Sequence, residues 1–300
     1  MSVTGSGSPL QYAYYPGCAS QEMTKEANET TREVAELLGI GLHDMPAANC
    51  CGAGLLTDYD YDLSVTMNAR IFAQAEKMGM DIMTICSTCL MVMNTVNRDL
   101  KSNPKLLEKT NGVLQKVGLT YSGKTNIKLL SWVLIEDYGL DNLAKKIVKP
   151  LHGLRVAPFY GCHSLRPSDA LGFDDPEQPT SLDDIIMTLG GDVVEYRGKT
   201  KCCGFQVDLV SEDTALEMTG RRLLDAKNEG GVCLVTPCPF CHINLDSYQK
   251  LAEKKIDAQL SLPIFHLAQL VGLALGMSAE RLKLSRHLVS AEALLNELGT

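Results

Sequence analysis

The sequence predicts an α/β protein built of two pseudo-twofold-related halves, each a small sheet flanked by helices, with the cysteines on loops. Ten of the eleven cysteines form two arrays of five with nearly the same spacing. Short words around matching cysteines also agree, namely YYPGC with FYGC, NCCGAG with KCCGFQ, and MTICSTC with VTPCPFC. Segments with strand-like and helix-like patterns follow one another in the same order in both copies.

The spacing of the two arrays indicates where the copies diverged. Cys162 follows Cys18 by 144 residues, whereas the other four matching pairs are 152 residues apart. An eight-residue insertion explains the difference, and we assign it to 166–180, where Pro, Asp and Gly are too dense for regular structure. The predicted divisions are a flexible leader (1–9), a first half (10–150), a second half (151–290) and a C-terminal tail (291–300).

The elements of the first half can be justified in chain order. Residues 10–15 read as a strand that ends at Pro16-Gly17, which puts Cys18 on the turn at its carboxyl end. A helical pattern follows and stops at Gly39. The remaining predicted elements are the helix 22–38, a strand near 41–45, the helix 63–78, the strand 81–85, a helix from 90, a helix and loop over 101–124, and a strand and helix over 126–140 that 262–275 repeats. Cysteines from three loops therefore converge at one end of each sheet.

Composition and charge exclude several classes of protein. A formal net charge of -8 argues against a nucleic-acid or anionic-membrane surface. The longest apolar stretch, 265–277, contains His266 and Gln269 and is too short for a transmembrane segment. The amino terminus lacks the pattern of a secretory signal, so we expect a cytoplasmic protein with reduced cysteines that are available to metal.

Five thiolates per array narrow the choice of bound group. Disulfides are disfavoured because adjacent cysteines rarely both pair well. A structural zinc would leave a fifth cysteine over. Iron–sulfur chemistry is the interpretation that we favour, whereas Cys233, outside both arrays, reads as ordinary core material in a strand.

From Tyr12 to about Ser278 the chain resembles the CCG domain found in the B subunit of heterodisulfide reductase, on the cysteine spacing and on the words YGCHSLRPS, CCGF and TPCPFCHINLDSYQ. The resemblance implies that each array binds a non-cubane [4Fe-4S] cluster and that a disulfide is cleaved between the two clusters. The implied ligands are Cys18, Cys50, Cys51, Cys86 and Cys89 for one cluster, and Cys162, Cys202, Cys203, Cys238 and Cys241 for the other.

Within this family, YYPGCAS together with NCCGAG is more similar to the heterodisulfide reductase-like complexes of sulfur oxidisers than to methanogen subunits, which commonly carry prolines at Gly52-Ala53-Gly54. The resemblance implies a disulfide or protein-bound sulfur substrate, and two partners in the complex, a cubane iron–sulfur protein and a flavoprotein. The ligand set does not fix the direction of the reaction. The alternative is an electron-transfer subunit of a succinate-, glycolate- or lactate-oxidising complex, without a substrate site of its own.

Two histidines distinguish the second array from the first. His163 follows Cys162 and His242 follows Cys241, whereas Ala19 and Leu90 stand at the matching positions. One interpretation makes both histidines catalytic, as proton donors or acceptors for substrate sulfur. The other makes them structural hydrogen-bond partners of backbone or sulfur. Lys201 also precedes Cys202 where the first half has Asn49, so we expect the more polar surroundings at the second array.

Overall fold

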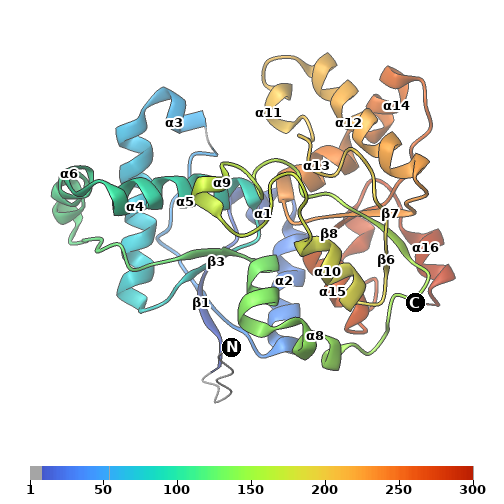
Figure 1. Ribbon diagram of the computed structural model, residues 1–300, viewed down its shortest axis with the longest axis horizontal. Coiled ribbons are helices and arrows are strands. Elements are labelled where there is room, and N and C mark those ends of the chain that lie inside the picture. The colour runs from blue at the N-terminus through green and yellow to red at the C-terminus, as the bar shows by residue number, and fades with distance from the viewer. Residues whose placement is uncertain (1–8, 54, 300) are drawn as a thin grey trace.

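The computed structural model describes residues 9–53 and 55–299, and contains two four-stranded parallel sheets with equivalent strand orders, β2-β1-β3-β4 and β6-β5-β7-β8. The strands are β1 (Gln11–Tyr15), β2 (Gly41–Asp44), β3 (Ile82–Thr84), β4 (Ile127–Leu129), β5 (Arg155–Pro158), β6 (Asp192–Val193), β7 (Cys233–Thr236) and β8 (Ile264–His266). Figure 1 shows the first half in blue to green and the second in yellow to red. The predicted α/β architecture of two related halves is confirmed.

Helices connect the parallel strands, as crossovers require. Those of the first half are α1 (Cys18–Glu22), α2 (Lys25–Leu38), α3 (Leu55–Tyr59), α4 (Tyr61–Met78), α5 (Ser87–Ser102), α6 (Pro104–Leu114), the 3-10 turn η1 (Gln115–Val117), α7 (Leu130–Trp132), the π-helix η2 (Val133–Tyr138) and α8 (Leu140–Lys146). As predicted, α2 ends at Gly39, whose left-handed φ of 73° suits a residue without Cβ.

The second half repeats the main helices of the first. They are α9 (Ser168–Leu171), α10 (Ser181–Thr188), α11 (Phe205–Asp208), α12 (Glu212–Asn228), α13 (Pro239–Ser247), α14 (Gln249–Ile256), α15 (Leu267–Ala274), the 3-10 turn η3 (Leu284–Arg286) and α16 (Glu292–Glu297). Helices α4 and α12 match closely, because Asp60 and Ser211 cap their N-termini with side-chain hydrogen bonds from the third residue of each helix. The two halves therefore share local signals as well as topology.

The segment 166–180 differs from its prediction in one place. Its composition predicts no regular structure, yet α9 forms one helical turn within it. Asp169 of this turn pairs with Arg98 on α5, and Phe173 stacks on Trp132 at 4.7 Å between ring centroids. The contacts with the first half stabilise a turn that the local composition alone disfavours, and they tie the insertion to the other half of the molecule.

The halves share one continuous apolar interface. Helix α2 of the first half packs on α15 of the second. Ala27 and Val34 of α2 belong to the same buried apolar cluster as Leu267 and Val271 of α15. Figure 1 shows α2 lying against the second half. The division of the chain at residue 150 stays a prediction, because neither half buries its apolar faces alone.

The two ends of the chain differ in what the structure describes. The leader 1–9 lies outside the described residues except for Pro9. At the other end, the predicted tail 291–300 contains α16, whose Leu294 is buried, and Lys149 donates a 2.7 Å hydrogen bond to the Gly299 carbonyl. Across the part of the chain that the structure describes, helices of sufficient length and apolarity to cross a bilayer are absent.

Candidate functional site

The five predicted cysteines of the first array come together at the carboxyl edge of its sheet. Cys18 opens α1 after β1, the adjacent pair follows β2, and Cys86 and Cys89 lie at the start of α5 after β3. The Sγ atoms of Cys51 and Cys89 are 3.4 Å apart, and those of Cys18 and Cys50 are 3.9 Å apart. Three loops therefore deliver thiols to one place, as parallel-strand topology predicts.

The second array repeats this arrangement. Cys162 follows β5, Cys202 and Cys203 follow β6, and Cys238 and Cys241 lie at the start of α13. In both arrays the second cysteine of the adjacent pair and both CxxC cysteines are buried, whereas the other two are more exposed. Each array thus has a closed inner side and an outer side near solvent.

The adjacent cysteine pairs are held by equivalent hydrogen bonds. Gly52 N–H donates to Cys50 Sγ, and Gly204 N–H donates to Cys202 Sγ, each at 3.4 Å. The hydrogen bond from Cys18, more than any other contact, lowers the pKa of Cys50 to about 2, and that from Cys162 does the same for the pKa of Cys202. These contacts favour the thiolate form of both cysteines, the form that binds metal.

The helix behind each pair holds the pair's backbone. The Asn68 side chain on α4 donates to the Cys51 carbonyl at 3.0 Å, and the Thr219 hydroxyl on α12 donates to the Cys203 carbonyl at 3.0 Å. These contacts satisfy carbonyl groups that are buried beside the sulfur atoms. They fix the loop that carries each pair.

Two glycines leave room for the sulfur atoms. A Cβ at Gly17 would lie 3.1 Å from Cys89 Sγ, and one at Gly161 would lie 3.2 Å from Cys241 Sγ. Both glycines have positive φ, 79° and 69°. The chain therefore passes each array without a side chain, which leaves space for a bulky group at the thiols.

We expect Gly161→Ala to lower the iron content of the purified protein, because the new methyl group presses on Cys241. Its left-handed φ also costs about 1 kcal/mol of stability. Gly79→Ala is the matched control, since Gly79 has the same φ of 69° with nothing within 4 Å of its Cβ position. Iron analysis and chemical unfolding check this. Equal iron in both variants would contradict the role of Gly161.

The two arrays lie side by side between the halves. The thiols of Cys86 in the first array and Cys238 in the second lie close enough to shift each other's pKa, and the Thr88 hydroxyl is 3.9 Å from Cys238 Sγ. The loops after the cysteine pairs also meet, because Gln206 Nε2 donates to the Ala53 carbonyl at 2.8 Å. One composite site therefore contains thiols from both halves.

The structure separates the two predicted histidines. His163 lines a cavity with all five cysteines of the second array, and Ser87 and Thr88 of the first-half CxxC loop lie in the same wall. Its Nδ1 is 3.1 Å from the Thr88 hydroxyl. Burial lowers the pKa of His163, so this imidazole is neutral near pH 7.

His242 faces a different set of side chains. It is 2% exposed, its Nδ1 lies 3.7 Å from Glu26 Oε1, and its ring meets the edge of His287 at 4.7 Å between centroids. Burial lowers the pKa of His242 well below the usual range and raises the pKa of Glu26. Sequence reasoning missed Thr88, Glu26 and His287 because each approaches from a remote segment, and no local pattern marks such contacts.

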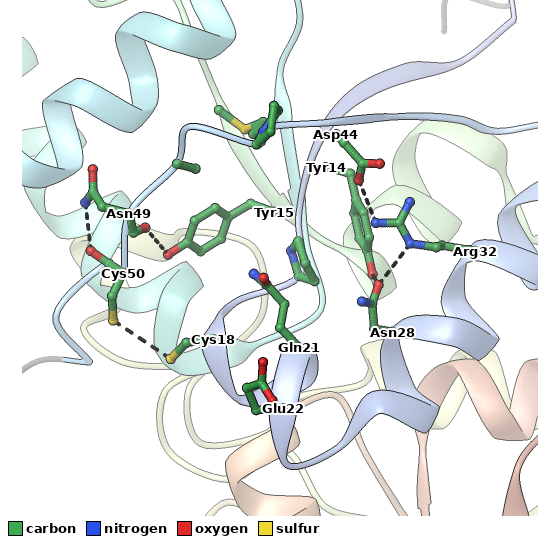
Figure 2. A pocket seen from close by; sticks show the side chains of 14 residues that line it. Tyr14, Tyr15, Cys18, Gln21, Glu22, Asn28, Arg32, Asp44, Asn49 and Cys50 are labelled. Atoms are coloured by element: carbon green, nitrogen blue, oxygen red, sulfur yellow. Dashed lines mark hydrogen bonds and ion pairs between the residues drawn. The ribbon is translucent and has the colours of Figure 1, made fainter.

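An open pocket of about 490 Å³ lies beside the outer cysteines of the first array. Figure 2 shows Cys18 and Cys50 on one side of it, with the Tyr15 hydroxyl donating to the Asn49 carbonyl at 2.9 Å. On the other side, Arg32 and Asp44 form an ion pair at 2.6 Å. The cation of this pocket is therefore neutralised within it.

Comparison with known proteins agrees with this geometry. The pattern of the CCG family, described as a cysteine-rich domain, matches residues 12–94 and 156–246, one match in each half. The chain belongs to the CCG family of proteins related to the B subunit of heterodisulfide reductase. Membership implies iron–sulfur clusters, and the convergent thiols with their glycine-lined space fit such groups.

Two relatives of this CCG protein match over nearly its whole length. It is 37% identical over 284 residues to the 8-methylmenaquinol:fumarate reductase membrane anchor subunit of Wolinella succinogenes, covering 95% of this chain and 99% of the relative. It is 31% identical over 276 residues to the B subunit of the ferredoxin:CoB-CoM heterodisulfide reductase of Methanosarcina mazei, covering 91% and 92%.

A solved structure shares the fold. The crystal structure of a hypothetical protein from Helicobacter pylori superposes with a TM-score of 0.79 at 16% identity, covering 95% of this chain and 53% of that one. At this identity the likeness supports the fold alone.

Proposed function

We propose that this CCG protein is the catalytic iron–sulfur subunit of a heterodisulfide reductase-like complex, acting on disulfide, thiol or sulfane sulfur. Two non-cubane [4Fe-4S] clusters, one per array, would supply or accept single electrons. The ligands in this proposal are the five cysteines of each array, namely Cys18, Cys50, Cys51, Cys86 and Cys89, and Cys162, Cys202, Cys203, Cys238 and Cys241.

The observation that carries the proposal is the small cavity at the second array, of about 20 Å³, where five thiols meet the imidazole of His163 and the side chains of Ser87 and Thr88 from the first half. Reducing a disulfide consumes two electrons and two protons and yields two thiols, so it needs hydrogen-bonding groups at the sulfur atoms. A pure electron relay needs none. The imidazole and hydroxyl groups in this mostly apolar cavity therefore support chemistry on a sulfur substrate.

The two histidines have different parts in this proposal. His163 is the catalytic residue, because it lines the cavity and its hydrogen bond to Thr88 orients the ring toward the substrate sulfur. His242, packed against Glu26 and His287, acts behind the array as a positioning residue for the neighbouring Cys241. This assignment divides a pair that the sequence treats alike.

The proposal extends to partners, direction and location. The names of the relatives support membership of a multi-subunit reductase, and we propose a flavoprotein and a cubane iron–sulfur protein as partners. The proposal that the reaction runs in the direction of sulfur oxidation depends only on the sequence segments YYPGCAS and NCCGAG. We assign the complex to the cytoplasm, because thiols must stay reduced to bind iron.

A second candidate is an electron-transfer subunit without a substrate site. Two observations favour it: the relative at 37% identity is named as part of a fumarate reductase, and Cys86 and Cys238 bring the two arrays into contact. Close cofactors suit electron passage in either case. The candidates differ in whether sulfur compounds react at this subunit.

We expect the anaerobically purified chain, reduced by a viologen dye, to release free thiols from a small disulfide. It should show no turnover with NADH alone, because the sequence has no nucleotide-binding fingerprint. Thiol titration and dye oxidation measure both. Reduction of a menaquinone analogue without thiol release would favour the electron-transfer candidate, and NADH turnover without added protein would contradict the need for partners.

A further inference from the structure

Three buried side chains of types that bind metal ions meet behind the second array. They are Glu26 of α2, His242 of α13 and His287, which follows η3. One ligand atom of each lies within 4.8 Å of those of the other two, and the three residues are 6%, 2% and 9% exposed. The cluster therefore joins the first half, the second half and the C-terminal segment at one enclosed point.

The polar atoms of this cluster lack the partners that buried groups normally have. Both ring nitrogens of His242 and Nδ1 of His287 are buried and make no hydrogen bond of normal geometry with the described residues. Within the same part of the chain the Glu26 carboxylate has no lysine or arginine partner, and Arg286, which lies near it, pairs with Glu29 at 3.1 Å. Native proteins rarely leave buried polar atoms unpaired. A bound cation accounts for this cluster, because it takes up a lone pair from all three side chains.

The donor atoms and their spacing fit zinc. Imidazole nitrogen and carboxylate oxygen are ordinary zinc ligands, and tetrahedral bonds of about 2.0–2.1 Å place ligand atoms about 3.4 Å apart. Glu26 Oε1 lies 3.7 Å from His242 Nδ1, which is already close to that spacing. Two histidines and one carboxylate leave one position that water can fill. We propose that Glu26, His242 and His287 bind one Zn²⁺ ion, which holds the two halves of the protein together behind the second array.

One neighbouring side chain has to adjust for this coordination. The Gln269 amide nitrogen lies 2.9 Å from His287 Nε2 and donates to the Leu282 carbonyl, while its oxygen accepts from the His266 N–H. When Nδ1 of His287 binds the metal, the imidazole proton is on Nε2 and needs an acceptor. The amide must then turn its oxygen toward Nε2, as an outer partner that orients a metal-bound histidine. A glutamate at this position has one oxygen for Nε2 and another for the His266 N–H.

The position of the site gives the ion a structural role. Helices α1 and α13 pack against each other where the halves meet, and Figure 1 shows them close together. His242 directly follows Cys241, a proposed cluster ligand, so an ion that fixes His242 also steadies the turn that carries Cys241. The zinc site does not depend on the sulfur chemistry proposed above, and its tests need no turnover.

The first test is elemental analysis of the anaerobically purified, cluster-loaded protein from zinc-supplemented cultures. We expect about one zinc atom per chain in addition to the iron of the clusters. X-ray absorption at the zinc edge should show nitrogen and oxygen ligands at about 2.0–2.2 Å and no sulfur at about 2.3 Å. Sulfur ligands would place the zinc in the cysteine arrays and overturn the proposal, as would a protein without zinc.

Variants of the ligands test the site directly. Glu26→Gln should weaken zinc binding about a hundredfold in competition with a chelator, with unchanged iron content, whereas Gln269→Glu should strengthen it about tenfold. His152→Ala is the matched control, because it removes an exposed histidine outside the cluster, and it should keep its zinc. Removal of zinc should lower the Tm of the wild type but not that of Glu26→Gln. Wild-type zinc affinity in Glu26→Gln would overturn the proposal, and weaker binding in Gln269→Glu would exclude His287 as a ligand.

Discussion

Substitution of Cys51→Ser or of Cys203→Ser is expected to halve the iron content of the protein, from about eight atoms per chain to about four. Acid-labile sulfide should fall in parallel. Each cysteine is buried within its own array, and its alcohol counterpart is a poor ligand for iron. Each half supplies its ligands from its own three loops, so the other cluster should remain. Anaerobic iron and sulfide analysis with visible spectroscopy measures the effect.

Cys233→Ala is the matched control, because Cys233 is a buried cysteine of β7 outside both arrays. It should keep full iron and lose only modest stability. Loss of both clusters from either serine variant with the fold intact would disprove independent sites. About two zinc atoms per chain in a colourless wild-type protein would disprove the iron–sulfur assignment altogether.

We expect His163→Ala to lower turnover about a hundredfold, the size of lost general acid–base assistance, with unchanged iron content. The imidazole lines the cavity of the second array and contacts Thr88. Steady-state kinetics with excess electron donor, together with iron analysis, check the effect. Thr88→Val should cause a smaller loss in kcat, because it removes only the group that orients the ring.

Changes at the matching positions of the first array, Ala19→Ser and Leu90→Met, should matter much less. Full activity of His163→Ala with intact clusters would reduce this residue to a structural neighbour. A comparable loss in His242→Ala, at unchanged iron and stability, would restore the simpler hypothesis that both histidines act directly on the substrate.

The sequence determined the features that local patterns encode. The repeated cysteine spacing and the strand before Pro16 predicted three converging loops in each half, and the structure brings those cysteines together. Gly39 also predicted the end of α2. A glycine can adopt the left-handed backbone conformation that ends a helix, because it has no Cβ. These predictions succeed because strand, turn and helix signals act over a few residues.

The tertiary structure alone decided how the halves face each other. The contacts of Thr88 with His163 and of Gln206 with Ala53 join segments 75 and 153 residues apart, and they exist because the apolar faces of α2 and α15 pack together. The helical turn at Asp169 depends on its ion pair with Arg98 of the other half, and His163 and His242 are separated by their different remote partners, Thr88 and Glu26. Hydrophobic packing is non-directional along the chain, so no local pattern specifies which polar side chains it brings to one site.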